Sequence, residues 1–289
     1  MMNAHSRQRH ARYYFQRGTD IFAVGGTLYK IHADLLGLRG GVLQDLFELP
    51  QSSENREGLT DDQPIQLPQV TEREFEHFLE LIYDGHLLPP YSLEKLADIL
   101  KLSTQWGVDS GRQWAIHHLE ASRNVPASLR LQLARRYNVP QWVEPAFREL
   151  VFCISLGELR GDDFVHLSYP VYILITKLKE AVEHERRVVA YLAPECKTHG
   201  PSCSNPERCS LIWRETWWLK IGRRLLHPDA DQSMPLEKGP GAVESLEWAG
   251  MSPACRENMV ATVARGDGFA GAAEIFKSGL MKLAELAVE

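Results

Sequence analysis

TDIFAVGGTLYKIH, residues 19–32, contains two short apolar runs that are separated by a pair of glycines. The runs are Ile21 to Val24 and Leu28 to Ile31. Gly25 and Gly26 can take the positive φ angle that a tight hairpin requires. A phosphate-binding loop would need more glycines and a following Lys-Ser or Lys-Thr pair, which is absent here. The stretch therefore predicts a β-hairpin.

Upstream of the hairpin, Tyr13-Tyr14-Phe15 predicts the start of another strand. The first seventeen residues contain Arg7, Arg9, Arg12 and Arg17 and no acidic residue. They lack the apolar core of a secretory signal, so we expect a solvated basic terminus.

Downstream, two short helices are predicted at 32–38 and 41–48, followed by an exposed loop at 50–64 and a strand at 65–67. Thr71-Glu72-Arg73-Glu74 is a capping box, in which Thr71 and Glu74 each bind the backbone amide of the other. The helix that it begins is predicted to end at Gly85. Its buried face is predicted from the spacing i, i+3, i+4, i+7 of Phe75, Phe78, Leu79 and Ile82.

The rest of the chain shows mainly helical spacing. Helices are predicted from Ser92, at 110–119, after Pro126, around Val143 to Leu150, and after Pro170. The segment 194–210 breaks the helical pattern, a Trp-rich helix is predicted at 211–226, a loop at 227–241, and two closing helices at 253–264 and 269–286. The predicted fold is α+β: a small sheet flanked by helices, followed by a mostly α-helical C-terminal region.

Four spaced motifs follow one another in the first half of the chain. They are Thr19-Asp20-Ile21, Tyr29-Lys30-Ile31-His32, Val42 to Phe47, and Ile65-Gln66-Leu67-Pro68 with Phe75, Leu79 and Tyr83-Asp84-Gly85. In type and order they resemble a BTB/POZ domain. Tyr137 to Trp142 and Trp213 to Trp218 are similar to the helical extension of fungal BTB-domain proteins. The resemblance implies a BTB/POZ domain at 10–122, a helical extension at 123–192, and a Cys- and Trp-containing helical region at 193–289.

The resemblance implies a protein-interaction adaptor or scaffold, with other proteins as partners. We expect a monomer or a weak homodimer, because the stretch before the first core strand has no apolar helical stripe. We expect no catalysis: the chain has no G-x-S-x-G, H-E-x-x-H or dinucleotide-binding motif. Asp20 is expected to satisfy backbone amides at a strand start, His32 to be a structural histidine, and Cys153 to be a buried thiol.

Charge and hydropathy narrow the classes of partner. The formal net charge is −6, which does not favour a nucleic-acid-binding surface. The longest apolar run, Val171 to Ile175, is too short to cross a bilayer. Five cysteines are an odd number and do not suggest a disulfide framework, so we expect an intracellular protein of the cytoplasm or the nucleus.

One segment has the composition of a metal site: Cys196, His199, Cys203 and Cys209 lie within fourteen residues. Zinc prefers four thiolate or imidazole ligands in a tetrahedron, so these residues predict a structural zinc site. Cys255 could replace His199 as the fourth ligand. The alternative interpretation is a loop with free thiols, two of them packed against the Trp-rich helix.

The metal site suggests a second function: a zinc-containing transcriptional or chromatin-associated regulator that binds partners or nucleic acid through the C-terminal region. The basic residues near the site are diluted by Glu195, Glu207 and Glu215, so the adaptor remains the preferred function. Trp213 and Trp217 share one helix face and belong either to a packed core or to a binding hot spot.

Overall fold

The computed structural model describes residues 7–37, 57–84, 91–229 and 231–288. The chain divides into two compact units: residues up to Pro126 with Tyr137–Val139, and Ala127–Arg136 with Pro140–Glu289. The domain boundaries expected from the sequence stay predictions. The predicted helix at 41–48 with its Val42 to Phe47 motif, the first part of the loop at 50–64, and the helix end at Gly85 lie outside the described residues.

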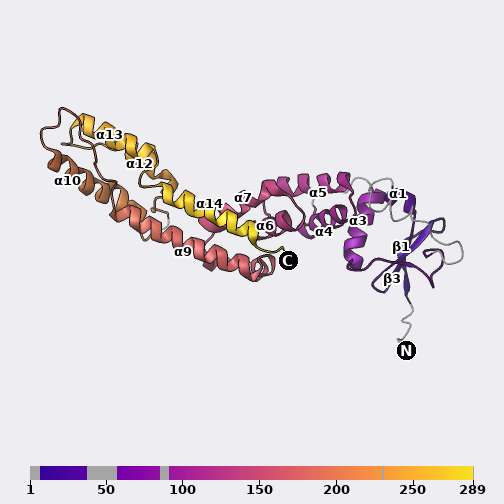
Figure 1. Cartoon of the computed structure of the whole chain (residues 1–289). Helices are drawn as coiled ribbons and strands as arrows, with labels where there is room; N and C mark the ends of the chain where they lie inside the picture. The colour runs from indigo at the N-terminus through magenta and orange to yellow at the C-terminus, as the bar shows by residue number, and fades with distance from the viewer. Residues whose placement is uncertain (1–6, 38–56, 85–90, 230, 289) are drawn as a thin grey trace. The chain divides into compact units, whose positions relative to one another are not determined.

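The first unit is built on a four-stranded sheet with the order β1-β3-β2-β4 (Figure 1). The strands are β1 (Gln8–Tyr14), β2 (Asp20–Val24), β3 (Thr27–Ile31) and β4 (Ile65–Gln66). The predicted hairpin is confirmed: β2 and β3 are antiparallel, with Phe22 opposite Tyr29. β1 runs parallel to β3, and β4 runs parallel to β2.

The basic N-terminal segment is part of this sheet, so the expectation of a solvated tail was wrong for residues 8–12, whereas the strand expected at Tyr13 and Tyr14 is confirmed. Arg9 lies 2.6 Å from a carboxylate oxygen of Asp61, and Arg12 lies 2.8 Å from one of Asp84. Tyr13 is buried. The strand forms because its aromatic residue packs into the core while its arginines pair with acidic residues elsewhere in the unit.

The α-helices described in this unit are α1 (Ala33–Gly37), α3 (Glu72–Asp84), α4 (Leu93–Gln105) and α5 (Asp109–Ala121). α3 and the end of α4 share a hydrophobic core with the strands. The capping box of α3 is confirmed: the Thr71 amide donates to Glu74 over 3.0 Å, and the Glu74 amide donates to the Thr71 hydroxyl over 3.3 Å. Phe75, Phe78 and Leu79 are fully buried, as their helical spacing predicts.

The second unit is helical throughout the part that the structure describes. Its α-helices are α6 (Ala127–Arg136), α7 (Val143–Arg148), α8 (Gly161–His166), α9 (Tyr169–Tyr191), α10 (Pro206–Trp217), α11 (Arg223–Leu225), α12 (Gly239–Ser245), α13 (Pro253–Ala264) and α14 (Ala270–Glu285). Short 3₁₀ or π turns connect several of them: η1 (Pro140–Trp142), η2 (Glu149–Cys153), η3 (Leu156–Glu158), η4 (Trp218–Gly222) and η5 (Leu236–Lys238). α14 lies alongside α9 (Figure 1), and Phe276 and Leu283 of α14 share a core with Leu174 and Ile175 of α9.

Three expectations about this unit are corrected. The Trp-rich helix begins at Pro206 and not at residue 211, because the Asn205 side chain accepts from the Arg208 amide and proline suits the first helical turn. Part of the predicted loop at 227–241 is η5 and the start of α12. Cys153 is exposed. It lies at the end of the π turn η2, whose wider spacing buries Leu150 and Val151 and turns Cys153 outward.

No helix in the described ranges has the combination of length and apolar composition that a membrane crossing requires.

The β2–β3 hairpin gives a matched pair of variants for testing backbone strain. Gly25 has φ +56°, and a Cβ there would lie 2.8 Å from Glu72 Oε1. Gly26→Ala is the control, since its nearest neighbour would be 3.9 Å away. We expect Gly25→Ala to destabilise the hairpin by about 1–2 kcal/mol, because L-residues disfavour the left-handed region. Hydrogen exchange of the β2–β3 amides would then be roughly tenfold faster than in Gly26→Ala. Equal exchange rates in the two variants would contradict this account.

Candidate metal centre

The loop between α9 and α10 is anchored by two buried tryptophans of α10. Trp213 Nε1 donates to the Pro194 carbonyl over 2.9 Å, and Trp217 Nε1 donates to the Val189 carbonyl over 2.8 Å. Both side chains are 1% exposed, so they belong to a packed core. The Trp217 indole satisfies a carbonyl in the last turn of α9, and the Trp213 indole satisfies a carbonyl of the loop that follows. This fixes where the loop starts and how α10 faces it.

Four side chains converge at this place: His199, Cys203, Cys209 and Cys255. Their potential ligand atoms all lie within 4.8 Å of one another, so the group could hold a metal ion. His199 and Cys203 lie on the loop, while Cys209 and Cys255 lie in the first turns of α10 and α13. Both helices lie at one end of the second unit (Figure 1).

The distances within the group resemble the edges of a coordination tetrahedron. Cys203 Sγ lies 3.7 Å from Cys209 Sγ, and His199 Nδ1 lies 3.5 Å from Cys255 Sγ and 3.9 Å from Cys203 Sγ. Zinc bonds of about 2.3 Å to sulfur and about 2.05 Å to nitrogen would give tetrahedral edges of about 3.8 Å between sulfurs and about 3.6 Å between sulfur and nitrogen. These three of the six donor pairs are therefore close to the edge lengths around a single ion, and all four donors lie within 4.8 Å of one another.

Backbone amides around the cluster stabilise thiolates. Gly200 N donates to Cys255 Sγ over 3.3 Å, and Ser252 N donates to Cys209 Sγ over 3.5 Å. Although burial opposes it, the hydrogen bonds from Gly200 and His199 lower the pKa of Cys255 to about 7. Burial, together with the neighbouring thiols, raises the pKa of Cys203 to about 11. Cys255 therefore ionises more readily than an ordinary thiol, whereas Cys203 ionises less readily, and a bound cation would favour the thiolate of both.

A glycine is required where the loop meets α13. A Cβ on Gly200 would lie 2.4 Å from the Ala254 Cβ. Only glycine lets the loop approach closely enough for its amide to reach Cys255.

The structure brings together three of the four ligands expected from the sequence: His199, Cys203 and Cys209. The fourth member is Cys255. The sequence offered Cys255 as a replacement for His199, but in the structure both residues belong to the group. Cys196 lies outside this group of four, with its Sγ 3.8 Å from His199 Nδ1. The signal for Cys255 was local: Ser252-Pro253 begins a helix as Asn205-Pro206 does, and each start places a cysteine in a first turn.

A second polar cluster, which sequence reasoning missed, lies between α6 and α8. Ser128 Oγ donates to Asp163 Oδ1 over 2.5 Å and lies 3.2 Å from His166 Nδ1. In a nucleophilic triad the carboxylate would orient the histidine and the serine would face the substrate. Here Asp163 binds the serine directly, and Ser128 is fully buried. Burial also lowers the pKa of His166. The arrangement joins two helices and does not form a hydrolytic site.

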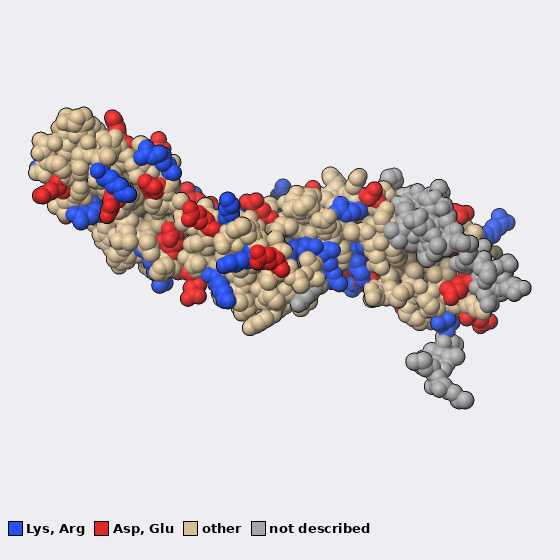
Figure 2. Space-filling view, viewed as in Figure 1, with Lys and Arg blue, Asp and Glu red and all other residues tan. Residues whose placement is uncertain are grey.

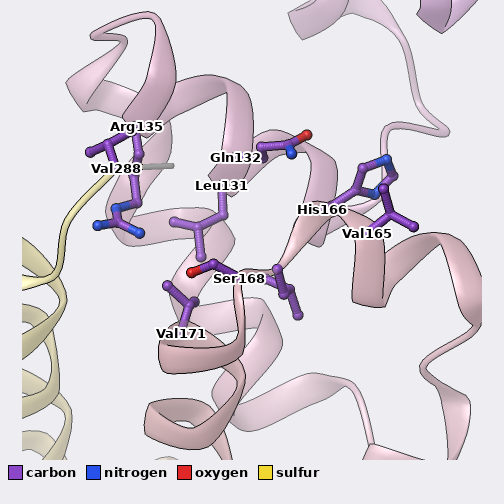
Figure 3. A pocket seen from close by; sticks show the side chains of 9 residues that line it. Leu131, Gln132, Arg135, Val165, His166, Ser168, Val171 and Val288 are labelled. Carbon is purple, nitrogen blue, oxygen red and sulfur yellow. The ribbon is translucent and has the colours of Figure 1, made fainter.

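The cavity beside this cluster, of about 80 Å³, is lined by Leu131, Arg135, His166 and Val288 among others (Figure 3). Arg135 Nη2 donates to the Leu286 carbonyl over 2.7 Å, at the end of α14. The guanidinium therefore caps a helix terminus, and the cavity is too small for an organic substrate.

The exposure of the thiols predicts their order of alkylation. Cys153 is exposed, Cys196 and Cys203 are half-buried, and Cys209 and Cys255 are buried. We expect iodoacetamide to modify Cys153 first and Cys209 and Cys255 last, because the reagent must reach the sulfur. Peptide mass spectrometry over a time course measures this order, with Cys153→Ser as the control that removes the fast phase. Modification of Cys255 as fast as Cys153 would contradict the burial of the cluster.

Comparison of the chain with protein-family models finds no match, and comparison with curated protein sequences finds none either.

Proposed function

We propose that this protein is a non-catalytic interaction adaptor of the cytoplasm or the nucleus. In this proposal the N-terminal unit is a BTB/POZ-type domain, and the C-terminal unit presents a partner-binding surface that a structural zinc ion stabilises. The observation that carries the proposal is an exposed aromatic patch on the C-terminal unit.

That patch, which we call the α9–η4 patch, consists of Tyr191, Leu192, Trp218 and Leu219. These side chains are 69%, 66%, 38% and 53% exposed, respectively. The rings of Tyr191 and Trp218 contact each other, with centroids 4.9 Å apart. Exposed apolar side chains that cluster in this way mark interaction sites, and Trp and Tyr are the residues most enriched in binding hot spots.

The N-terminal unit supports the BTB/POZ part of the proposal through the contact between two of its motifs. The His32 amide donates to the Tyr83 hydroxyl over 2.9 Å, and His32 Nδ1 lies 3.2 Å from the same oxygen. The end of β3 is thereby joined to the end of α3. Phe75 and Leu79, two further motif positions, are fully buried. The residues that carry the resemblance are thus residues that hold this unit together.

The donor set favours zinc as the metal. Three thiolates and one imidazole suit zinc, whereas magnesium and calcium prefer oxygen ligands. Protein side chains would occupy all four positions, which leaves no position for a substrate water, so the ion would be structural. All five cysteines are free and therefore available as thiolate ligands.

Surface charge supports a protein partner over nucleic acid. On the face shown in Figure 2, lysine and arginine side chains alternate with aspartate and glutamate and form no continuous basic stripe. A nucleic-acid reader would gather positive charge along one surface.

Removing one ligand together with the neighbouring thiol tests the zinc proposal. We expect about one zinc per chain in protein purified without added metal, and its loss in the Cys196→Ala/Cys203→Ala double variant, because the three donors that remain hold the ion far less tightly than four. The C-terminal unit should then exchange amide hydrogens faster from residue 194 to 226, while the sheet of the N-terminal unit is unchanged. Plasma mass spectrometry and hydrogen exchange measure the two effects.

The matched control is Cys153→Ala, which removes an exposed thiol outside the cluster and should keep its zinc. Wild-type protein without zinc, whose melting temperature does not change on chelation, would end the zinc proposal.

The patch is tested by replacing its two rings. Tyr191→Ser combined with Trp218→Ser should lose partners that wild-type protein recovers in proximity labelling. Losing a hot-spot side chain costs about 2 kcal/mol or more, which is roughly 30-fold in affinity. Tyr169→Ser is the control, because Tyr169 is 75% exposed on the same unit but lies at the other end of α9. If the double variant and the control recover the same proteins, the patch is not the binding surface.

A further inference from the structure

The metal centre has five donors for four positions. Besides the group of four, Cys196 lies with its Sγ 3.8 Å from His199 Nδ1, about the length of one coordination edge. Cys196 and His199 are both half-buried, and only Lys197 and Thr198 separate them along the chain. We infer that Cys196 is an alternative zinc ligand that exchanges with His199, while Cys203, Cys209 and Cys255 remain bound. This inference rests on the proposed zinc centre.

His199 Nδ1 lies close to three cysteine sulfurs, one of which is the alternative ligand. It lies 3.5 Å from Cys255 Sγ, 3.8 Å from Cys196 Sγ and 3.9 Å from Cys203 Sγ. Cys196 Sγ is therefore next to the ligand position that His199 occupies. A change in the side-chain torsions of these two residues would bring one donor in and move the other out.

The two exchanging donors lie on irregular backbone, whereas two of the retained donors lie in helices. Cys196 and His199 belong to the irregular loop that precedes α10, whereas Cys209 and Cys255 belong to helices. Both helical sulfurs also accept backbone amides, from Ser252 and Gly200. Such second-shell bonds hold a ligand in place. The exchange thus needs no movement of α10 or α13.

The exchange is balanced in bonds and protons. The bond from zinc to His199 nitrogen breaks, and a bond from zinc to Cys196 sulfur forms. The Cys196 thiol loses its proton, which the freed imidazole or the solvent accepts, and no electron is transferred. With His199 bound, three thiolates leave one net negative charge on the centre, and with Cys196 bound, four thiolates leave two. The choice between the two loop residues as ligand thereby sets the net charge of the centre.

Four full-length proteins test the inference: wild type, Cys196→Ser, His199→Ala and the double variant. Zinc content after dialysis against a chelator shows which donor sets hold the ion. Substitution with cobalt(II) reports the number of thiolates, because the thiolate-to-cobalt absorption grows with each sulfur bound. Cys153→Ser is the control for the loss of a thiol outside the centre.

We expect each single variant to retain one zinc and the double variant to lose it. In the cobalt-substituted proteins, His199→Ala should bind the ion through four sulfurs and Cys196→Ser through three. The thiolate absorption of His199→Ala should therefore be larger by about one third. If His199→Ala loses zinc or fails to fold while Cys196→Ser keeps its zinc, Cys196 cannot replace the histidine and the inference is wrong. Equal absorption in the two single variants would also overturn it. Wild-type protein without zinc would instead contradict the proposed zinc centre itself.

Discussion

The hydrogen bond from the Trp217 indole to the Val189 carbonyl is the interaction on which the C-terminal unit depends most. It joins the last turn of α9 to α10, and Trp213 repeats the bond one turn earlier to Pro194. Trp248 then stacks on Trp213, with ring centroids 4.1 Å apart. A tryptophan can do this because it buries a large apolar area while its N–H reaches a backbone acceptor. The loop that carries His199 and Cys203 is held at both ends by this core.

The same core explains why a metal ion would be useful at this place. The loop from Ala193 to Asn205 contains few apolar side chains, so its ordering cannot rest on hydrophobic burial alone. Cys209 and Cys255 approach it from two helices, and their sulfurs accept amide hydrogen bonds before any ion is considered. A tetrahedral ion between these donors would join α10, α13 and the loop. The α9–η4 patch lies at the end of α9 and in η4, which directly follows α10, so a stable centre would also hold the α10 side of that surface in place.

The N-terminal unit depends on a different kind of interaction. Its sheet is small, and the core between sheet and helices is aromatic, with Tyr29 against Phe75 and Phe78 against Trp106 in edge-to-face contacts. Ion pairs then fix the ends: Arg12 with Asp84 beside β1, and Lys101 with Glu74 at the capping box of α3. The burial of the rings supplies most of the stabilisation, whereas peripheral ion pairs such as these contribute little each.

The sequence by itself determined the elements whose signals are local. Gly25-Gly26 between two apolar runs predicted the hairpin, Thr71 and Glu74 predicted the cap of α3, and the spacing of Phe75, Phe78 and Leu79 predicted its buried face. It also placed His199, Cys203 and Cys209 near one another, because they are neighbours along the chain. The sequence offered Cys255, 46 residues after Cys209, only as a replacement for His199, and the tertiary structure decided that it joins His199 and that Cys196 stands beside the group. It likewise decided that Cys153 faces outward and that β1 belongs to the sheet. The physical reason is that hydrogen bonds and helical periodicity act over a few residues, whereas ligand geometry and strand pairing depend on how distant helices and strands pack.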